Sequence, residues 1–224
     1  MGGRQTTRVP TSRAAALLLL LTVIVPIAGQ ERAPRGRLFT PEDLGLLEGP
    51  DRDAWQKPDQ IMDALLIADG ATVADVGAGG GWFTVRLARR VGPNGTVYAE
   101  DIQPQMIEAI ERRVLREGLD NVRMILGTPD DPALPESSLD AVLIVNTYFE
   151  MEDPVALLAN VARALKPRGR IGIVDFTRDG GGPGPPMEER VDAAVVVRNG
   201  EAAGLRLLKQ ESFLSYQYLL VLGK

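Results

Sequence analysis

The chain has 224 residues, 45% of them apolar, and a formal net charge of −5, so it can bury one good core beside a separate tail. It contains no cysteine and no histidine, which excludes disulfides, zinc sites built on thiolate or imidazole ligands, cysteine nucleophiles and Ser-His-Asp triads. An acidic chain without a stripe of arginine and lysine argues against nucleic acid as a partner, because phosphate neutralisation supplies most of that affinity.

The N-terminus has the layout of a secretory signal peptide. Three arginines precede an apolar segment, residues 14–29, which ends in small residues. This run is shorter than the roughly 20 residues that a spanning helix needs, and Pro26 interrupts its end. We expect residues 1–29 to be a signal peptide or an uncleaved N-terminal anchor, and residues 30–50 to be a linker. The protein is then exported (periplasmic or secreted) or membrane-anchored, and a tether that leaves the domain on the cytoplasmic side stays open.

Strands and helices alternate through residues 51–224, which we expect to form one domain. A helix is expected from Asp51, with Pro58 in a first-turn position. Short apolar runs predict strands at 72–76, 96–100, 122–126, 139–145 and 171–175. Helical spacing of apolar residues predicts helices at 82–91, 104–117, 154–165 and 188–203. The runs 205–210 and 216–222 are close enough in sequence to pair as an antiparallel hairpin. The alternation predicts a doubly wound parallel sheet.

The most informative motif lies where the first strand ends. Residues 72–83 read TVADVGAGGGWF, with Asp75 followed by glycines at alternate positions and then by a helical pattern. A strand that runs into a glycine turn and a helix N-terminus can hold a nucleotide-like ligand, because glycine accepts positive φ and lets the ligand touch the backbone. A dinucleotide fingerprint would need a third glycine where this chain has Trp82, and a P-loop would need Gly-Lys-Ser/Thr.

With this motif, residues 53–224 resemble the class I S-adenosylmethionine (SAM) dependent methyltransferases, closest to their quinone- and small-molecule-methylating branch. The resemblance implies an α/β, Rossmann-like sheet of seven strands in the order 3-2-1-4-5-7-6, with strand 7 antiparallel. It also implies SAM as cofactor and transfer of its methyl group to a small-molecule acceptor, which the sequence does not identify. No metal is expected.

The resemblance assigns a set of cofactor-binding residues, namely Asp75, Gly77, Ala78, Gly79, Gly81, Asp101, Ile102, Asp130 and Asn146. Asp101 falls on the family's acid at the end of the second strand, which takes the ribose hydroxyls, and Glu100 could serve instead. The adenine-edge aspartate of the family falls on Thr128. Asp130 is the expected substitute, with the backbone of residues 127–128 or a simple turn as alternatives.

In the family, the loop after the fourth strand faces the transferring methyl group. Here Asn146 and Phe149 have the outer spacing of the Asn-Pro-Pro-Tyr/Phe motif of amine-methylating enzymes, but both prolines are missing. Tyr148 and Glu150 are the candidates for orienting a substrate or taking a proton; the alternative is a packed tyrosine and a helix-capping acid. Methyl transfer can rely on positioning and desolvation, so a site without His and Cys is compatible with it.

Two more segments are candidates for shaping an acceptor pocket. Residues 55–58 precede the glycine motif where family members place a lid, and residues 213–218 are rich in aromatic side chains, although core packing is the alternative for Phe213 and Tyr218. Two other functions stay open. One is an exported, non-catalytic module that binds a nucleotide-like ligand. The other is a nicotinamide-linked oxidoreductase, which Trp82 disfavours.

Overall fold

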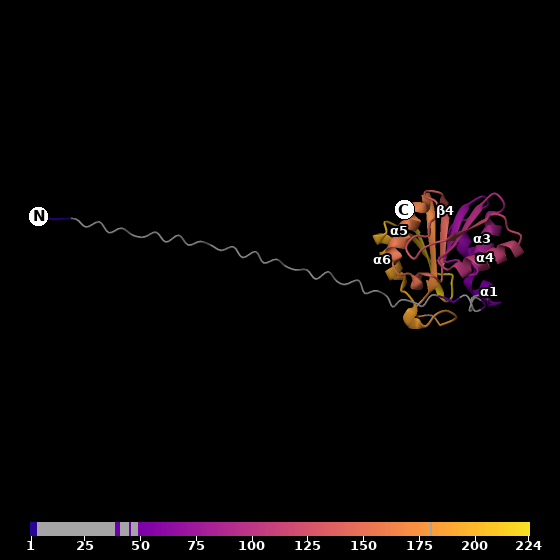
Figure 1. Ribbon diagram of the computed structural model, residues 1–224. Helices are drawn as coiled ribbons and strands as arrows, with labels where there is room; N and C mark the ends of the chain where they lie inside the picture. Colours follow the sequence, from indigo (N-terminus) through magenta and orange to yellow (C-terminus); the bar gives the residue numbers. More distant parts are fainter. Residues whose placement is uncertain (4–38, 41–44, 46–48, 180) are drawn as a thin grey trace. The chain divides into compact units, whose positions relative to one another are not determined.

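A seven-stranded sheet of order β3-β2-β1-β4-β5-β7-β6 organises the structure (Figure 1). The computed structural model describes residues 1–3, 39–40, 45, 49–179 and 181–224. The strands are β1 (Thr72–Val76), β2 (Thr96–Asp101), β3 (Val122–Leu126), β4 (Leu139–Val145), β5 (Leu165–Phe176), β6 (Arg206–Glu211) and β7 (Gln217–Gly223). The first five strands pair in parallel, whereas β7 pairs antiparallel with both β5 and β6. The predicted strand order and the antiparallel seventh strand are confirmed.

Helices cover both faces of the sheet, and Figure 1 shows α3 and α4 on one side and α5 and α6 on the other. The α-helices are α1 (Arg52–Gln56), α2 (Pro58–Ala64), α3 (Trp82–Val91), α4 (Pro104–Arg116), α5 (Pro154–Ala164) and α6 (Ala193–Ala202), and the short 3₁₀ helices are η2 (Tyr148–Glu150) and η3 (Met187–Glu189). β4 is buried on both faces, since Leu143 joins the apolar cluster under α2, α3 and α4 and Ile144 joins the cluster under α5 and α6. This explains why its sequence is an almost unbroken apolar run.

Two predicted helices differ from the structure. The helix expected from Asp51 is two short helices, because Lys57 takes a left-handed conformation (φ 48°) ahead of Pro58. The helix expected at 188–203 begins only at Ala193, where the Asp192 carboxylate caps it by accepting a hydrogen bond from the backbone N–H of Ala194. Upstream of that cap the chain is extended at residues 190 and 192.

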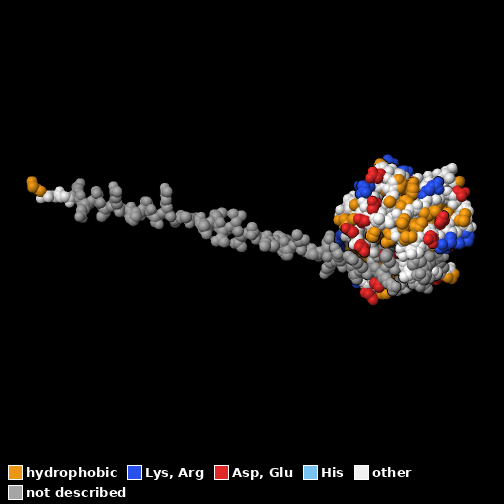
Figure 2. All heavy atoms as spheres, in the orientation of Figure 1, with side chains coloured by type: hydrophobic (Ala, Val, Ile, Leu, Met, Phe, Trp, Pro, Cys, Tyr) orange, Lys and Arg blue, Asp and Glu red, His pale blue; other side chains and the backbone are white. Residues whose placement is uncertain are grey.

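On the face of the molecule seen in Figure 2, acidic and basic side chains are interspersed around exposed apolar atoms, so neither charge dominates that face. Within the part of the chain that the structure describes, no helix is long and apolar enough to cross a membrane. The predicted signal segment at 14–29 lies outside the described residues, as does most of the predicted linker at 30–50.

Candidate active site

The glycine turn after β1 lies at the point where the strand order reverses, between β1 and β4. Gly77, Gly79 and Gly81 all have positive φ, at 68°, 55° and 78°. A Cβ on Gly77 would lie 2.3 Å from Cγ2 of Thr147, a contact that real Cβ atoms do not make. The first turn position therefore requires glycine both for its conformation and for the close approach of the loop after β4.

The carboxylates at the end of β2 hold this turn in place. The backbone N–H of Gly77 donates to Oε2 of Glu100 at 3.3 Å, and that of Gly79 donates to Oδ2 of Asp101 at 2.9 Å. Oδ1 of Asp101 accepts a second backbone bond, from Gln103. Because each carboxylate oxygen can accept more than one bond, Asp101 keeps the capacity to receive ribose hydroxyls.

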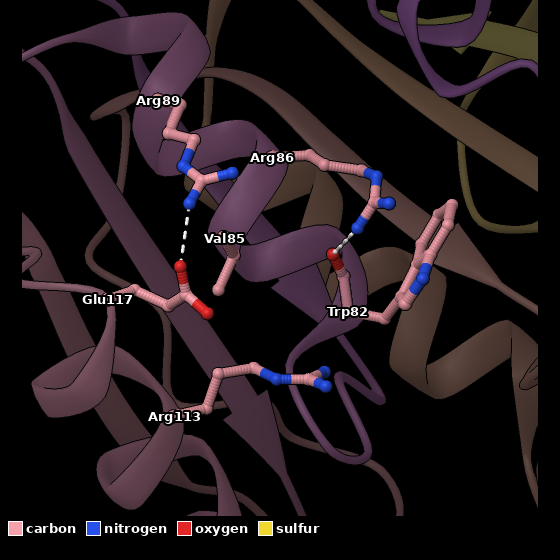
Figure 3. Close-up of a pocket in the computed structure, with 6 residues that line it drawn as sticks. All are labelled: Trp82, Val85, Arg86, Arg89, Arg113 and Glu117. Carbon is pink, nitrogen blue, oxygen red and sulfur yellow. Dashed lines mark hydrogen bonds and ion pairs between the residues drawn. The ribbon is translucent and has the colours of Figure 1, made fainter. Parts of the chain in front are cut away.

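Arginine side chains support the same turn from its outer side (Figure 3). Nη1 of Arg113 donates to the carbonyl oxygen of Gly80 at 2.9 Å, and Nη1 of Arg86 donates to that of Trp82 at 3.0 Å. The Arg86 guanidinium also lies 3.4 Å from the centroid of the Trp82 ring. The residues that make these contacts line a small surface hollow between α3 and α4. Their position indicates that Arg86 and Arg113 have a structural role in holding the turn.

A cavity of about 600 Å³ opens at the carboxyl ends of β1, β2 and β4, within the usual size range of small-molecule sites. Most of the predicted site residues line it: Asp75, Gly77, Ala78, Gly79, Asp101, Ile102, Asn146 and Glu150. Gly81 does not line it but forms the N-cap of α3. Asp130 is exposed in a turn, where it accepts a hydrogen bond from the Thr128 hydroxyl, and Thr128 and Pro129 reach the cavity in its place.

Buried carboxyl groups gather at the end of the cavity beside β1 and β2. Burial raises the pKa of Asp75 to about 6 and that of Glu100 to about 8, and it also raises the pKa of Asp101. Oε1 of Glu100 is buried and has no hydrogen-bond partner among the described residues. Arg52 is the only basic residue among the described residues that line the cavity. A ligand that carries positive charge and hydroxyl donors fits this lining, since it supplies what the buried carboxyl groups lack.

The other end of the cavity is apolar and aromatic. Trp55, Phe149 and Phe176 line it, and the Trp55 and Phe176 rings lie 6.0 Å apart. Residues 183–186 of the Gly-Pro-rich segment form another part of the wall. Arg190 holds that segment, because its guanidinium donates to the carbonyl oxygens of Pro185 and Thr177, both at 3.0 Å. This anchoring also explains the extended backbone ahead of α6.

The two candidate groups for proton transfer lie in different environments. Glu150 lines the cavity; burial raises its pKa to about 7, while a 3.5 Å hydrogen bond from the backbone N–H of Phe39 opposes that shift. Tyr148 lies in the apolar core under the loop, where its hydroxyl accepts a hydrogen bond from Asn199, and burial raises its pKa to about 12. The structure therefore favours Glu150 over Tyr148 as a proton acceptor near neutral pH.

Sequence reasoning did not single out Arg52 as a residue of the site. Its guanidinium lies 4.0 Å from the centroid of the Trp82 ring, so it reaches the cavity only because α1 packs beside the start of α3. No motif in the sequence marks that packing. Among the described residues, no group of three or more acidic side chains is arranged to hold a metal ion.

Comparison with known proteins agrees with this geometry. Residues 73–169 match the methyltransferase domain family. The chain is 36% identical over 141 residues to nocamycin O-methyltransferase of Saccharothrix syringae, a match that covers 63% of this chain and 48% of that one. It is 30% identical over 161 residues to the ubiquinone/menaquinone biosynthesis C-methyltransferase UbiE of Hahella chejuensis, covering 70% and 61% of the two chains. The chain thus spans about half the length of the curated relatives it matches first.

A solved structure matches more completely. The SAM dependent methyltransferase from Aquifex aeolicus superposes with a TM-score of 0.78 at 28% identity, over 82% of this chain and 98% of that one. The glycine turn at the switch point and the acids at the end of β2 lie within the residues that match the methyltransferase domain, and that domain forms part of the seven-stranded sheet. On these grounds, the chain belongs to the class I SAM-dependent methyltransferases.

Proposed function

We propose that this protein transfers a methyl group from SAM to a small-molecule acceptor. The observation that carries the proposal is a single cavity that is lined by glycines and carboxyl groups beside β1 and β2, by the aromatic side chains of Trp55, Phe149 and Phe176, and by Glu150. SAM, when bound, supplies a methyl group on a positively charged sulfur, so that methylated acceptor and S-adenosylhomocysteine are the products. The acidic lining suits a cofactor with a sulfonium and an ammonium group, and Arg52 suits its carboxylate.

The chain's own residues then have separate tasks. Asp101 accepts the ribose hydroxyls, with Glu100 as the alternative, and the turn at Gly77 and Gly79 allows close approach of the cofactor to the backbone. The aromatic wall excludes water from the acceptor, which strengthens electrostatic interactions inside the cavity. Glu150 takes the proton that the acceptor releases, because its pKa of about 7 leaves a large share of it ionised near neutral pH.

Titration calorimetry on the full chain tests the proposal with SAM, S-adenosylhomocysteine and NAD. We expect the first two to bind and NAD not to bind. Asp101→Ala should weaken SAM binding by about 1.5–3 kcal/mol, the range for hydrogen bonds to a charged group. Asp120→Ala, which removes an exposed carboxylate from the loop before β3, is the matched control and should leave the affinity unchanged. Binding of NAD without binding of SAM would refute the proposal. If Asp101→Ala leaves the affinity for SAM unchanged, the ribose contact is assigned to Glu100 instead.

We also propose, from the sequence alone, that residues 1–29 direct the chain to export or to a membrane anchor. The support is the charged start and the apolar segment at 14–29. A fusion of residues 1–40 to a reporter that is active only outside the cytosol tests this, and a silent reporter would place the domain on the cytosolic side.

A further inference from the structure

Four polar side chains form a continuous hydrogen-bonded relay that ends in the cavity. Nε of Arg52 donates to Oε1 of Gln56 at 2.6 Å, and Nε2 of Gln56 donates to Oε1 of Gln217 at 3.0 Å. Nε2 of Gln217 then donates to Oδ1 of Asn146 at 2.5 Å. Arg52, Gln56 and Gln217 are 7%, 0% and 3% exposed, so water does not replace these bonds. The relay joins α1, the start of β7 and the residue after β4.

The direction of this relay is set by chemistry at its first member. A guanidinium group has N–H donors and no acceptor, so the amide of Gln56 must turn its oxygen toward Arg52. That choice directs the amide nitrogen of Gln56 toward Gln217, which must in turn present its own oxygen. The same logic makes Asn146 accept at Oδ1. Reversing any one amide would bring two donors together at a buried position, which is unfavourable.

Asn146 is also fixed through its backbone. It has a positive φ of 56°, and its backbone N–H donates to the carbonyl oxygen of Val174 at 2.9 Å. Because the relay turns Oδ1 of Asn146 toward Gln217, the Nδ2 amide lies on the other side of the group and is what Asn146 can donate to a ligand. Asn146 lines the cavity near its aromatic wall, since its partner Gln217 is paired with Phe176 across β5 and β7.

We propose that Asn146 donates a hydrogen bond to the methyl acceptor, held in that orientation by the relay from Arg52, and that the acceptor therefore presents a hydroxyl oxygen there, as a phenol or an enol does, rather than an amine. This inference rests on the proposed function. An oxygen has a lone pair to accept the bond from Asn146 and a second one to attack the methyl group. A neutral amine has a single lone pair, which a bond from Asn146 would occupy. Asn146, which the resemblance assigns to the cofactor, is thus a contact residue of the acceptor in this proposal, whereas Gln56 and Gln217 are positioning residues.

A matched pair of probes tests the donor role by binding. The pair is 2-naphthol and 2-naphthylamine, which have the same shape and differ in the oxygen or nitrogen substituent. Dissociation constants are measured by fluorescence titration of the full chain saturated with S-adenosylhomocysteine. We expect the wild-type complex to bind 2-naphthol at least tenfold more tightly than 2-naphthylamine.

Gln217→Glu is designed to reverse the relay at its last step. A carboxylate accepts from both neighbours, so Gln56 keeps its bond while Asn146 turns Nδ2 toward residue 217 and Oδ1 toward the cavity. The naphthol preference should then fall at least tenfold. Gln210→Glu, which adds the same charge at an exposed position on β6, is the control and should keep the preference. A ratio of two affinities on one protein cancels general effects on folding or on the cofactor end.

Asn146→Asp gives a second route if Gln217→Glu does not fold, as judged by its melting temperature. This variant still accepts from Gln217 but has no N–H to donate, so its naphthol preference should also disappear. The inference is overturned if the wild-type complex prefers the amine, fails to discriminate or binds neither probe, or if either folded variant keeps the wild-type ratio. Failure of the wild-type chain to bind S-adenosylhomocysteine is a different result, because it overturns the proposed function itself.

Discussion

Replacing Gly77 by alanine should destabilise the fold through two effects that can be separated. The residue has φ of 68°, and a left-handed conformation costs a non-glycine residue about 1–2 kcal/mol. The added Cβ would also lie 2.3 Å from Cγ2 and 2.5 Å from Oγ1 of Thr147, and overpacking of this kind costs about 1–3 kcal/mol. We therefore expect Gly77→Ala to lower the free energy of unfolding by about 2–5 kcal/mol and to weaken SAM binding, since the turn must shift.

Two companion variants isolate the two effects. Gly118→Ala has a similar φ of 64° and open space around the new Cβ, so it should show only the conformational cost of about 1–2 kcal/mol. Thr147→Ala removes the two nearest atoms and leaves the Thr147 Cβ at 2.9 Å, so in its background the cost of Gly77→Ala should fall by at least about 0.5 kcal/mol.

Urea unfolding followed by circular dichroism measures all four proteins and the double variant. The reasoning is refuted if Gly77→Ala costs no more than Gly118→Ala, because the steric contact would then contribute nothing. It is also refuted if the effects of Gly77→Ala and Thr147→Ala are additive, because contacting residues should be coupled.

Two further predictions concern buried carboxyl groups. Burial raises the pKa of Glu150 to about 7, and only its ionised form can take a proton, so kcat/KM should fall about tenfold per pH unit below pH 7. Glu150→Gln should lower the rate about 10²–10⁴-fold and should abolish this decline of kcat/KM at low pH. A variant whose pH profile equals that of the wild type would exclude Glu150 as the base. Burial also raises the pKa of Asp175 to about 7 from its ordinary 3.8, so the folded state holds a proton that the unfolded state has lost, and stability should decline as pH rises from about 4 to 7. Melting temperatures across this range should show a smaller decline for Asp175→Asn and an unchanged one for the exposed Asp179→Asn, and equal declines in both variants would contradict the assignment.

Local sequence patterns were sufficient for most of the sheet and its helices. The strands at 72–76, 122–126 and 139–145 and the helix at 82–91 have the predicted bounds, because each is a clear apolar pattern that ends beside glycine, serine or asparagine. The helix expected at 188–203 was too long at its start. Residues 188 and 189 belong to the 3₁₀ helix η3, and the backbone is extended at residues 190 and 192, beside the contacts of the Arg190 guanidinium with the carbonyl oxygens of Pro185 and Thr177.

The candidate site likewise contains residues that local sequence patterns predict and residues that only the fold brings together. Gly77, Gly79 and Asp101 could be predicted because the glycine turn and the strand-end acid are adjacent to elements with strong periodicity. Asp130 is a turn residue outside the cavity and Tyr148 is a core residue, and neither position could be distinguished from a site residue by its sequence neighbours. Burial, which sets the pKa of Glu150 near 7, is likewise a property of the assembled fold.

The sequence by itself determined the class of fold, the glycine turn with its strand-end acids, and the exclusion of any chemistry that needs histidine or cysteine. These follow from residue types and spacings over a few positions. Only the tertiary structure decided which way the Asn146 amide faces, because Arg52, Gln56, Gln217 and Asn146 come from three distant segments. An amide has no preferred direction of its own, and it acquires one when buried partners leave a single arrangement in which every donor meets an acceptor.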